Sequence, residues 1–424
     1  MRRRAVTATN ETFRSLRVRN YRLYWVGQVI SMTGTWLQFI AQALLVLRLT
    51  DSGVALGLVT ACQFLPVLVV GGWAGLLADR VDKRRLMFGT QTVMMILALA
   101  LGSLTLAGIV TVWHVFVLAA LTGFAGAFDQ PARRALIPEL VADDDEVGNA
   151  VGLSSALFTG SRIVGPALAG WLITTVGMAW CFLLNGVSFV GVLIGLALMN
   201  PSEFRPSVRV PRAKGQIREG MRYVWRTPAL RLIIPLTGVI SLLSFNWHVL
   251  VPLLATRTLH GTTATFTLIT SMMSVGSLLG SLLLARRRDV PLRFLLQTCL
   301  AFGGASLAFA VAPTMLGAIV TGMAASALGI MFMAGTMTFA QTTAVPEMRG
   351  RVMALYTMVF LGTAPFGGPI LGWVAEQFGA RVGLAIGGLA ALVAAGTTLA
   401  ARARRARTDE PDLPDAVEPA LEAA

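Results

Sequence analysis

Residues 165–171 read Gly-Pro-Ala-Leu-Ala-Gly-Trp, and residues 368–373 read Gly-Pro-Ile-Leu-Gly-Trp. Two more pairs recur at a similar separation: Val29-Ile30-Ser31 with Val239-Ile240-Ser241, and Pro138-Glu139 with Pro346-Glu347. The separation shrinks slightly along the chain, as short loop insertions in one copy would cause. Both copies are almost wholly apolar. A duplicated apolar block of this length indicates two repeats of transmembrane helices, with a substrate site at the interface between the copies.

The composition supports a membrane protein. The 424 residues are 55% hydrophobic and 13% charged, with a mean hydropathy of +0.70, whereas a soluble domain has about 25% charged residues. Twelve apolar stretches are long enough to cross a bilayer. We therefore predict an all-α integral membrane protein with twelve transmembrane helices in two pseudo-symmetric six-helix bundles.

Composition also suggests the boundaries of the two bundles. They are expected at residues 23–199 and 231–401, after a basic N-terminal segment at residues 1–22. Residues 200–230 form a proline-containing linker between them. Residues 402–424 are rich in Pro, Asp, Glu and Ala and are predicted to be a disordered tail.

The net charge of +14 could suggest nucleic-acid binding, but its distribution argues against that partner. Of the 35 Lys and Arg residues, only Arg48, Arg257 and Arg381 fall in the loops on one side, and Arg162 lies within a span. The others lie on the opposite side, as the positive-inside rule requires of cytoplasmic segments. We expect a multi-pass protein of a bacterial inner membrane, in contact with the lipid bilayer, with both termini and the linker in the cytoplasm.

The sequence shows no pattern for a cofactor, a metal or an enzyme active site. Cys62, Cys181 and Cys299 lie in apolar spans without metal-ligand spacing. There is no phosphate-binding Gly-x-x-x-x-Gly-Lys motif, so ATP is not expected to drive the protein.

Polar residues form stripes on single helix faces, at spacings of three and four. The first span carries Gln28, Ser31, Thr35, Gln38 and Gln42, and its counterpart in the second copy carries Thr237, Ser241, Ser244 and His248. Such faces cannot point at lipid. The Gln and His side chains favour a water-filled substrate cavity, and helix packing is the alternative. Packing is favoured for a third stripe on span eight: Thr267, Thr270, Ser274, Ser277 and Ser281.

Arg162 is the one basic residue in the middle of a span, which makes it a functional candidate. It is either a structural residue or an anion-binding charge in the cavity. No Asp or Glu lies at mid-depth in any predicted span. His248 is therefore the first candidate for proton coupling, because an imidazole titrates near neutral pH, and Asp129 is the second.

The loop after the second span carries a family signature. Residues 75–85 read Gly-Leu-Leu-Ala-Asp-Arg-Val-Asp-Lys-Arg-Arg. This loop resembles that of the major facilitator superfamily, with Asp82 where the family usually has Gly. Gly160, Gly165, Pro166 and Gly170 resemble the antiporter motif of drug-efflux members, with imperfect spacing. Residues 128–133, 138–140, 162–167 and 349–353 resemble the enterobactin-exporter-like branch, the transmembrane secretion effectors.

The resemblance implies a latch between the bundles. In the family, the loop Asp caps the helix of span eleven and a basic residue four positions on pairs with an acid that ends span four. Carried over, Asp79 would cap the helix that starts near Arg351, and Lys83 would pair with Asp129. Gly75, Arg80 and Arg133 complete the expected latch. The alternative is that the basic run only fixes topology.

These patterns together predict a secondary transporter. We expect a monomeric, proton-driven exporter of a small, partly hydrophobic organic molecule such as a drug, siderophore or secondary metabolite. Uptake or lipid translocation on the same fold is one rival. A non-transporting receptor or assembly platform is a rival of a different class, and an enzyme is not expected.

Overall fold

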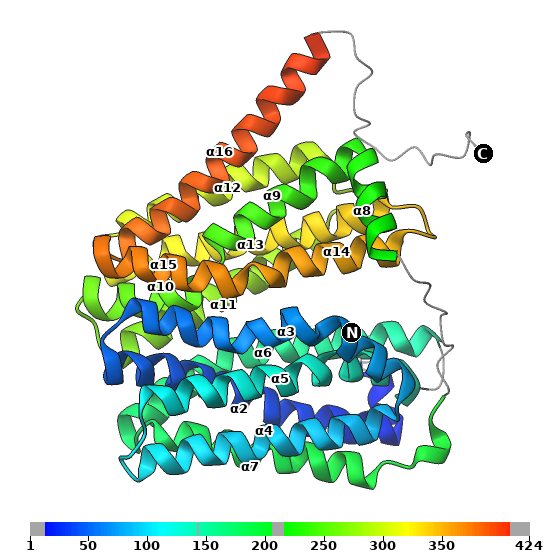
Figure 1. Cartoon of the computed structure of the whole chain (residues 1–424), viewed down its shortest axis with the longest axis vertical. Coiled ribbons are helices and arrows are strands. Elements are labelled where there is room, and N and C mark those ends of the chain that lie inside the picture. The colour runs from blue at the N-terminus through cyan, green and yellow to red at the C-terminus, as the bar shows by residue number, and fades with distance from the viewer. Residues whose placement is uncertain (1–12, 142–143, 206–215, 408–424) are drawn as a thin grey trace, which may run out of the picture. The chain divides into compact units, whose positions relative to one another are not determined.

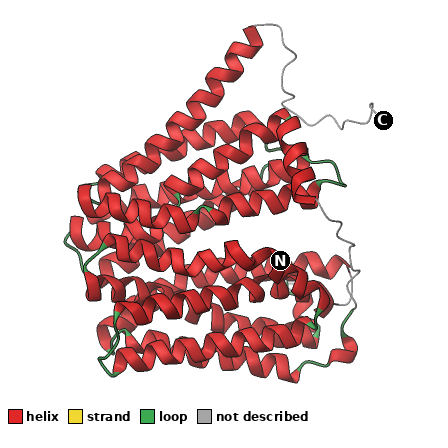
Figure 2. Cartoon of the chain, viewed as in Figure 1, coloured by secondary structure: helices red, strands yellow, loops and turns green. Residues whose placement is uncertain are grey.

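The computed structural model describes residues 13–141, 144–205 and 216–407. Within these ranges every regular element is a helix, and Figure 2 shows no strand among them. Twelve helical segments are long and apolar enough to cross a membrane. The predicted all-α membrane fold with twelve spans is therefore confirmed.

The chain forms two compact units, and the first comprises Met1–Asp51 and Cys62–Val210. Its elements are labelled in Figure 1. In chain order they are η1 (Arg14–Arg17), α2 (Arg19–Thr50), α3 (Gly53–Arg80), α4 (Lys83–Leu106), α5 (Val112–Leu136), η2 (Ile137–Leu140), α6 (Asp144–Thr175), α7 (Ala179–Leu198) and η3 (Pro201–Glu203).

The second unit comprises Ser52–Ala61, which includes the first turns of α3, and Pro211–Ala424. Its other elements are α8 (Gln216–Arg226), α9 (Pro228–Ser244), α10 (Trp247–Leu253), η4 (Leu254–Thr258), α11 (Thr263–Ala285), α12 (Leu292–Val311), α13 (Met315–Thr343), α14 (Arg349–Gly362), α15 (Ala364–Phe378) and α16 (Ala380–Arg407). The segment η4 is a π-helix.

The sequence repeat is also a repeat of packing. In the first unit α2 packs on α6 and α7, and α4 packs on α5 and α7. In the second unit α9 packs on α14 and α16, and α12 packs on α13 and α16. Because each partner holds the same place in its own six-span series, these four helix packings occur in both units. This agrees with two pseudo-symmetric bundles.

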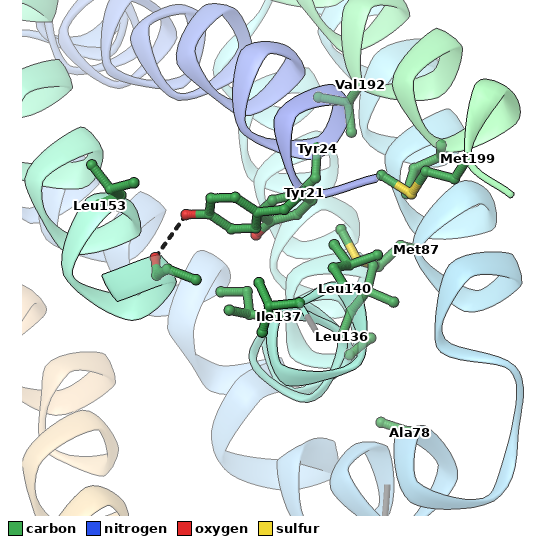
Figure 3. Close-up of a cluster of buried hydrophobic side chains, with 14 residues drawn as sticks. Tyr21, Tyr24, Ala78, Met87, Leu136, Ile137, Leu140, Leu153, Val192 and Met199 are labelled. Carbon is green, nitrogen blue, oxygen red and sulfur yellow. Dashed lines mark hydrogen bonds between the residues drawn. The ribbon is translucent and has the colours of Figure 1, made fainter. Parts of the chain in front are cut away.

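A cluster of buried apolar side chains holds one end of the first unit together (Figure 3). Tyr21 and Tyr24 of α2 lie in it, with Met87 of α4 and Leu136 of α5. The Tyr21 hydroxyl donates a hydrogen bond of 2.7 Å to the Ala150 carbonyl oxygen of α6, drawn as a dashed line in Figure 3. The first helix begins at Arg19, earlier than the expected residue 23, and so includes both tyrosines.

The other end of the chain also differs from expectation. The helix α16 continues to Arg407, so residues 402–407 are helical and do not belong to a disordered tail. Residues 408–424 of that predicted tail lie outside the described residues, as do residues 1–12 of the N-terminal segment and 206–215 of the linker. The remaining described part of the linker includes α8.

Two spans of the second unit are interrupted. In span seven, Phe245 and Asn246 are not helical, and Asn246 Nδ2 donates a 2.7 Å hydrogen bond to the Leu242 carbonyl oxygen that the break leaves without an amide donor. Span eleven is interrupted at Thr363, between α14 and α15. Ser241 Oγ donates to the Phe360 carbonyl oxygen at 2.8 Å and accepts from Thr363 Oγ1 at 2.9 Å. The two interruptions therefore lie beside each other.

Candidate functional site

The first unit contains a buried ion pair on α5. Asp129 is 2% exposed, and its Oδ2 accepts hydrogen bonds from Arg133 Nη2 at 2.6 Å and Nε at 3.2 Å. Its Oδ1 accepts from Thr90 Oγ1 at 2.9 Å and Gln91 Nε2 at 2.7 Å, both on α4. A carboxylate this deeply buried is stable as a charge only because these donors replace water.

The guanidinium of Arg133 connects this pair to the polar stripe of α2. Its Nη1 donates to Gln28 Oε1, and it lies 3.8 Å from the Met32 sulfur. Gln28 is therefore the one stripe residue that contacts the ion pair among the described residues. We call Asp129, Arg133, Gln28, Thr90 and Gln91 the α5 charge cluster.

Lys83 does not have the partner expected from the resemblance. Its Nζ lies 2.6 Å from Glu139 Oε1, and both side chains are nearly buried. Asp129 is occupied by Arg133 instead. The expected pairing of Lys83 with Asp129 was wrong because Arg133 lies one helical turn along α5, where i and i+4 side chains are neighbours. Glu139, in η2, supplies the acid for Lys83.

The other latch residues give a mixed result. Gly75 and Arg80 lie in the last turns of α3, and the side chain of Asp79 is outside the described part. Arg351 Nη1 lies 2.6 Å from Glu219 Oε1 of α8, so Arg351 forms an ion pair with an acid of the linker region. The latch itself stays a prediction.

The α2 stripe divides into bonded and open members. Ser31 is buried, and its carbonyl oxygen accepts from Thr35 Oγ1 at 2.9 Å. Gln38 Oε1 accepts from Asn185 Nδ2 of α7 at 2.7 Å, and Gln42 is 7% exposed. Thr35 is the exposed member of the stripe, and the cavity role of the stripe stays a prediction.

The span-seven stripe is bonded inside the second unit. Thr237 Oγ1 donates to the Ile233 carbonyl oxygen at 2.8 Å, and Ser241 contacts span eleven as described above. Ser244 Oγ donates to the Gly387 carbonyl oxygen of α16 at 2.8 Å. The Ser241 and Ser244 bonds are helix-packing contacts, whereas the Thr237 bond lies within α9. The break at residues 245–246 also removes the helical phase that would have put His248 on the same face as Ser244.

The packing interpretation of the span-eight stripe has geometric support. Ser277 Oγ lies 2.5 Å from Ser326 Oγ of α13. Gly276 and Gly280 allow this approach, because a Cβ at either position would lie within 2.9 Å of a backbone carbon of α13.

A polar network on span eleven was not predicted from the sequence. The Tyr356 hydroxyl donates a hydrogen bond to the Met333 carbonyl oxygen at 2.9 Å and contacts Thr336 Oγ1 at 2.9 Å.

Arg162 lies against an aromatic side chain rather than an acid. Its Cζ is 5.7 Å from the ring centroid of Trp36 on α2. Within the described residues it makes no hydrogen bond or ion pair. An Arg at the centre of a span costs about 2.5 to 3.5 kcal/mol on insertion, whereas a cation–π contact returns about 0.5 to 2 kcal/mol. Its charge is therefore only partly compensated.

The Gly-Pro segment of α6 places this arginine. A Cβ at Gly165 would lie 3.3 Å from Trp36 Cγ and closer still to its Cβ, so only glycine lets the helices approach this closely here. Pro166 lies inside the helix, and Gly160 has open space around it. Gly170 is buried.

Sequence comparison identifies the family. The family model described as transmembrane secretion effector matches residues 10–423. The chain belongs to the transmembrane secretion effector family. This confirms the branch of the major facilitator superfamily that the motifs suggested.

Named relatives of this family member are transporters. The chain is 25% identical to macrolide efflux protein A of Streptococcus pyogenes over 84% of this chain and 89% of the relative. It is 25% identical to the staphyloferrin A transporter of Staphylococcus aureus over 62% of this chain and 66% of the relative. It is 29% identical to an MFS-type transporter of Bacillus subtilis, YfiS, over 51% of this chain. The match spans 50% of that last relative.

A solved structure shares the fold. A bacterial homologue of the human lysosomal transporter Spinster, in an inward-facing and unoccupied conformation, superposes with a TM-score of 0.68 at 15% identity. The superposition covers 95% of this chain and 99% of that one.

Proposed function

We propose that this secretion effector is a secondary transporter that exports a small, partly hydrophobic organic molecule by alternating access. The match to the family model over residues 10–423 carries the proposal. Relatives named for macrolide efflux and for staphyloferrin A transport support export of an organic molecule. Twelve candidate spans are consistent with that role.

We further propose that protons drive export through the α5 charge cluster. Asp129 is a buried carboxylate held by Arg133. Protonation would remove the charge that holds the guanidinium, so Arg133 and its partner Gln28 would be released together. A proton-coupling site needs this property, because a proton bound on α5 then changes the contacts that α5 makes with α2. His248 on α10 is the alternative coupling residue, because imidazole titrates in the working pH range.

Inside-out vesicles test the proposal. A radiolabelled macrolide should accumulate when the lumen is acidic, and collapse of the pH gradient should abolish accumulation. In Asp129→Asn, gradient-driven accumulation should be lost while exchange of labelled for unlabelled macrolide across the membrane persists. Asp289→Asn, at an exposed acid, is the matched control and should behave as wild type.

The outcomes separate the rivals. Accumulation that ignores the gradient would exclude proton drive. Movement only in right-side-out vesicles would indicate uptake. No exchange of any macrolide, carboxylate siderophore or labelled lipid would favour a non-transporting platform.

A further inference from the structure

We propose that Arg162 and the aromatic side chains around it bind the anionic group of a flat aromatic substrate, such as an arene carboxylate. The inference rests on the proposed export function and names a substrate class for it. The site lies within the first unit, between α2 and α6.

The aromatic surroundings are built around Trp36. Its ring centroid is 5.5 Å from that of Phe39 and 6.2 Å from that of Phe158, both edge-on. Phe158 precedes Arg162 by one turn of α6 and is 50% exposed. Arg162 is half-buried over the Trp36 ring. A positive charge and two ring surfaces are thus offered on one face.

A comparison with Arg133 of α5 shows why Arg162 is available. Arg133 is satisfied by the Asp129 carboxylate and by Gln28. Arg162 has the Trp36 ring and, within the described residues, no acceptor. The cation–π contact offsets only part of the cost of a charge at this depth. An incoming carboxylate would complete the compensation, in the bidentate geometry that guanidinium groups favour.

The neighbours also indicate the shape of the ligand. Ser161, the neighbour of Arg162 in the chain, has its Oγ 3.4 Å from Thr33 Oγ1, so these two hydroxyls contact each other. A phosphate would need several further donors, whereas the rings of Phe39 and Phe158 supply none and the Trp36 indole has a single N–H. A planar carboxylate needs only the guanidinium, and its ring can pack edge-on against Trp36 and Phe158.

Equilibrium binding to the purified full chain in lipid nanodiscs tests the site. The two probes are 2-naphthoate and its neutral isostere naphthalene-2-carboxamide. Wild type should bind the naphthoate at least about tenfold more tightly, because only the anion forms the charge-assisted pair. Arg162→Gln should remove that preference, Arg162→Lys should keep part of it, and carboxamide affinity should change by less than about threefold.

A matched control is available on the surface. Arg287 lies 3.9 Å from the Phe294 ring centroid, so Arg287→Gln removes a cation–π arginine at another site and should leave both probes unaffected. Equal wild-type affinity for the two probes would overturn the proposal without recourse to any variant. Equal loss of both probes in a well-folded Arg162→Gln protein would make Arg162 structural. Naphthoate binding without flux of naphthoate, macrolide or siderophore would retain this site and reject the proposed export, and flux of any of these without naphthoate binding would do the reverse.

Discussion

Removing Arg133 alone should destabilise the protein much more than removing the charges of Arg133 and Asp129 together. In Arg133→Gln, the buried carboxylate keeps only Thr90 and Gln91 as donors. In Asp129→Asn, the guanidinium keeps only neutral partners, among them Gln28 and the Met32 sulfur. Each single variant leaves one buried charge without its counter-ion, whereas the double variant leaves none.

The structure sets the size of the effect. Two unit charges about 4 Å apart interact by about 4 kcal/mol at an effective dielectric constant of about 20. Loss of one partner of a buried pair costs about 3 to 5 kcal/mol, and replacement of both partners costs far less. We expect the free energy of unfolding to fall by about 3 to 5 kcal/mol in each single variant and by about 1 to 2 kcal/mol in the double variant.

The measurement is a double-mutant cycle. Detergent titration of the purified protein in mixed micelles gives the free energy of unfolding of the wild type, the two single variants and the double variant. The exposed pair Asp82–Arg85 is the matched control: its atoms are 3.7 Å apart, and the side chains are 50% and 89% exposed. Its coupling energy should stay below about 1 kcal/mol. If the two losses at the buried pair simply add to within about 0.5 kcal/mol, the charges are not coupled and the reasoning fails.

Three further outcomes are expected. Gly276→Ala should lower the free energy of unfolding by about 1 to 3 kcal/mol, because its Cβ would lie 2.9 Å from the Met323 carbonyl carbon. Gly304→Ala, where the Cβ meets open space, should raise it by up to about 1 kcal/mol. Equal unfolding midpoints for the two variants would contradict this. Ser202→Cys in a Cys-free background should react with an impermeant maleimide only in inside-out vesicles, and labelling from outside would invert the predicted topology. His248→Ala should shift the pH profile of transport between about pH 5 and 8 if it is the coupling residue, and an unchanged profile would eliminate it.

The sequence predicted the larger features because they depend on long averages. The hydropathy of a span is an average over many residues, so the twelve spans could be predicted from it. The repeat matches at several positions along the chain, so two pseudo-symmetric bundles could be predicted as well. The position of Arg162 in the middle of a span was also visible in the sequence. The contact of Arg162 with Trp36 was not visible, because residue spacing shows which side chains share a helix face but not which helix packs against that face.

Individual partners were harder to predict. Asp129 and Glu139 both precede the end of the same segment, and spacing alone could not decide which acid faces Lys83. The Asp129–Arg133 spacing of four residues was a usable signal that favoured a pair within α5. The break at Phe245 and Asn246 had no such signal, because neither residue is Gly or Pro and aromatic packing accompanies it: Phe245 stacks on Trp247 at 5.2 Å.

The neighbouring interruptions of spans seven and eleven have a mechanical consequence. A continuous helix bends only by straining its hydrogen-bond ladder, but a pair of helices broken at adjacent points already has a joint. The segments α10 and α15 should therefore pivot as half-helices about residues 245–246 and 363, while α9 and α14 stay fixed in their own packing. Opening of this unit would then require only a local rearrangement. Amide exchange at residues 245–246 and 363 that is as slow as in the middle of α13 would show that the joint is rigid.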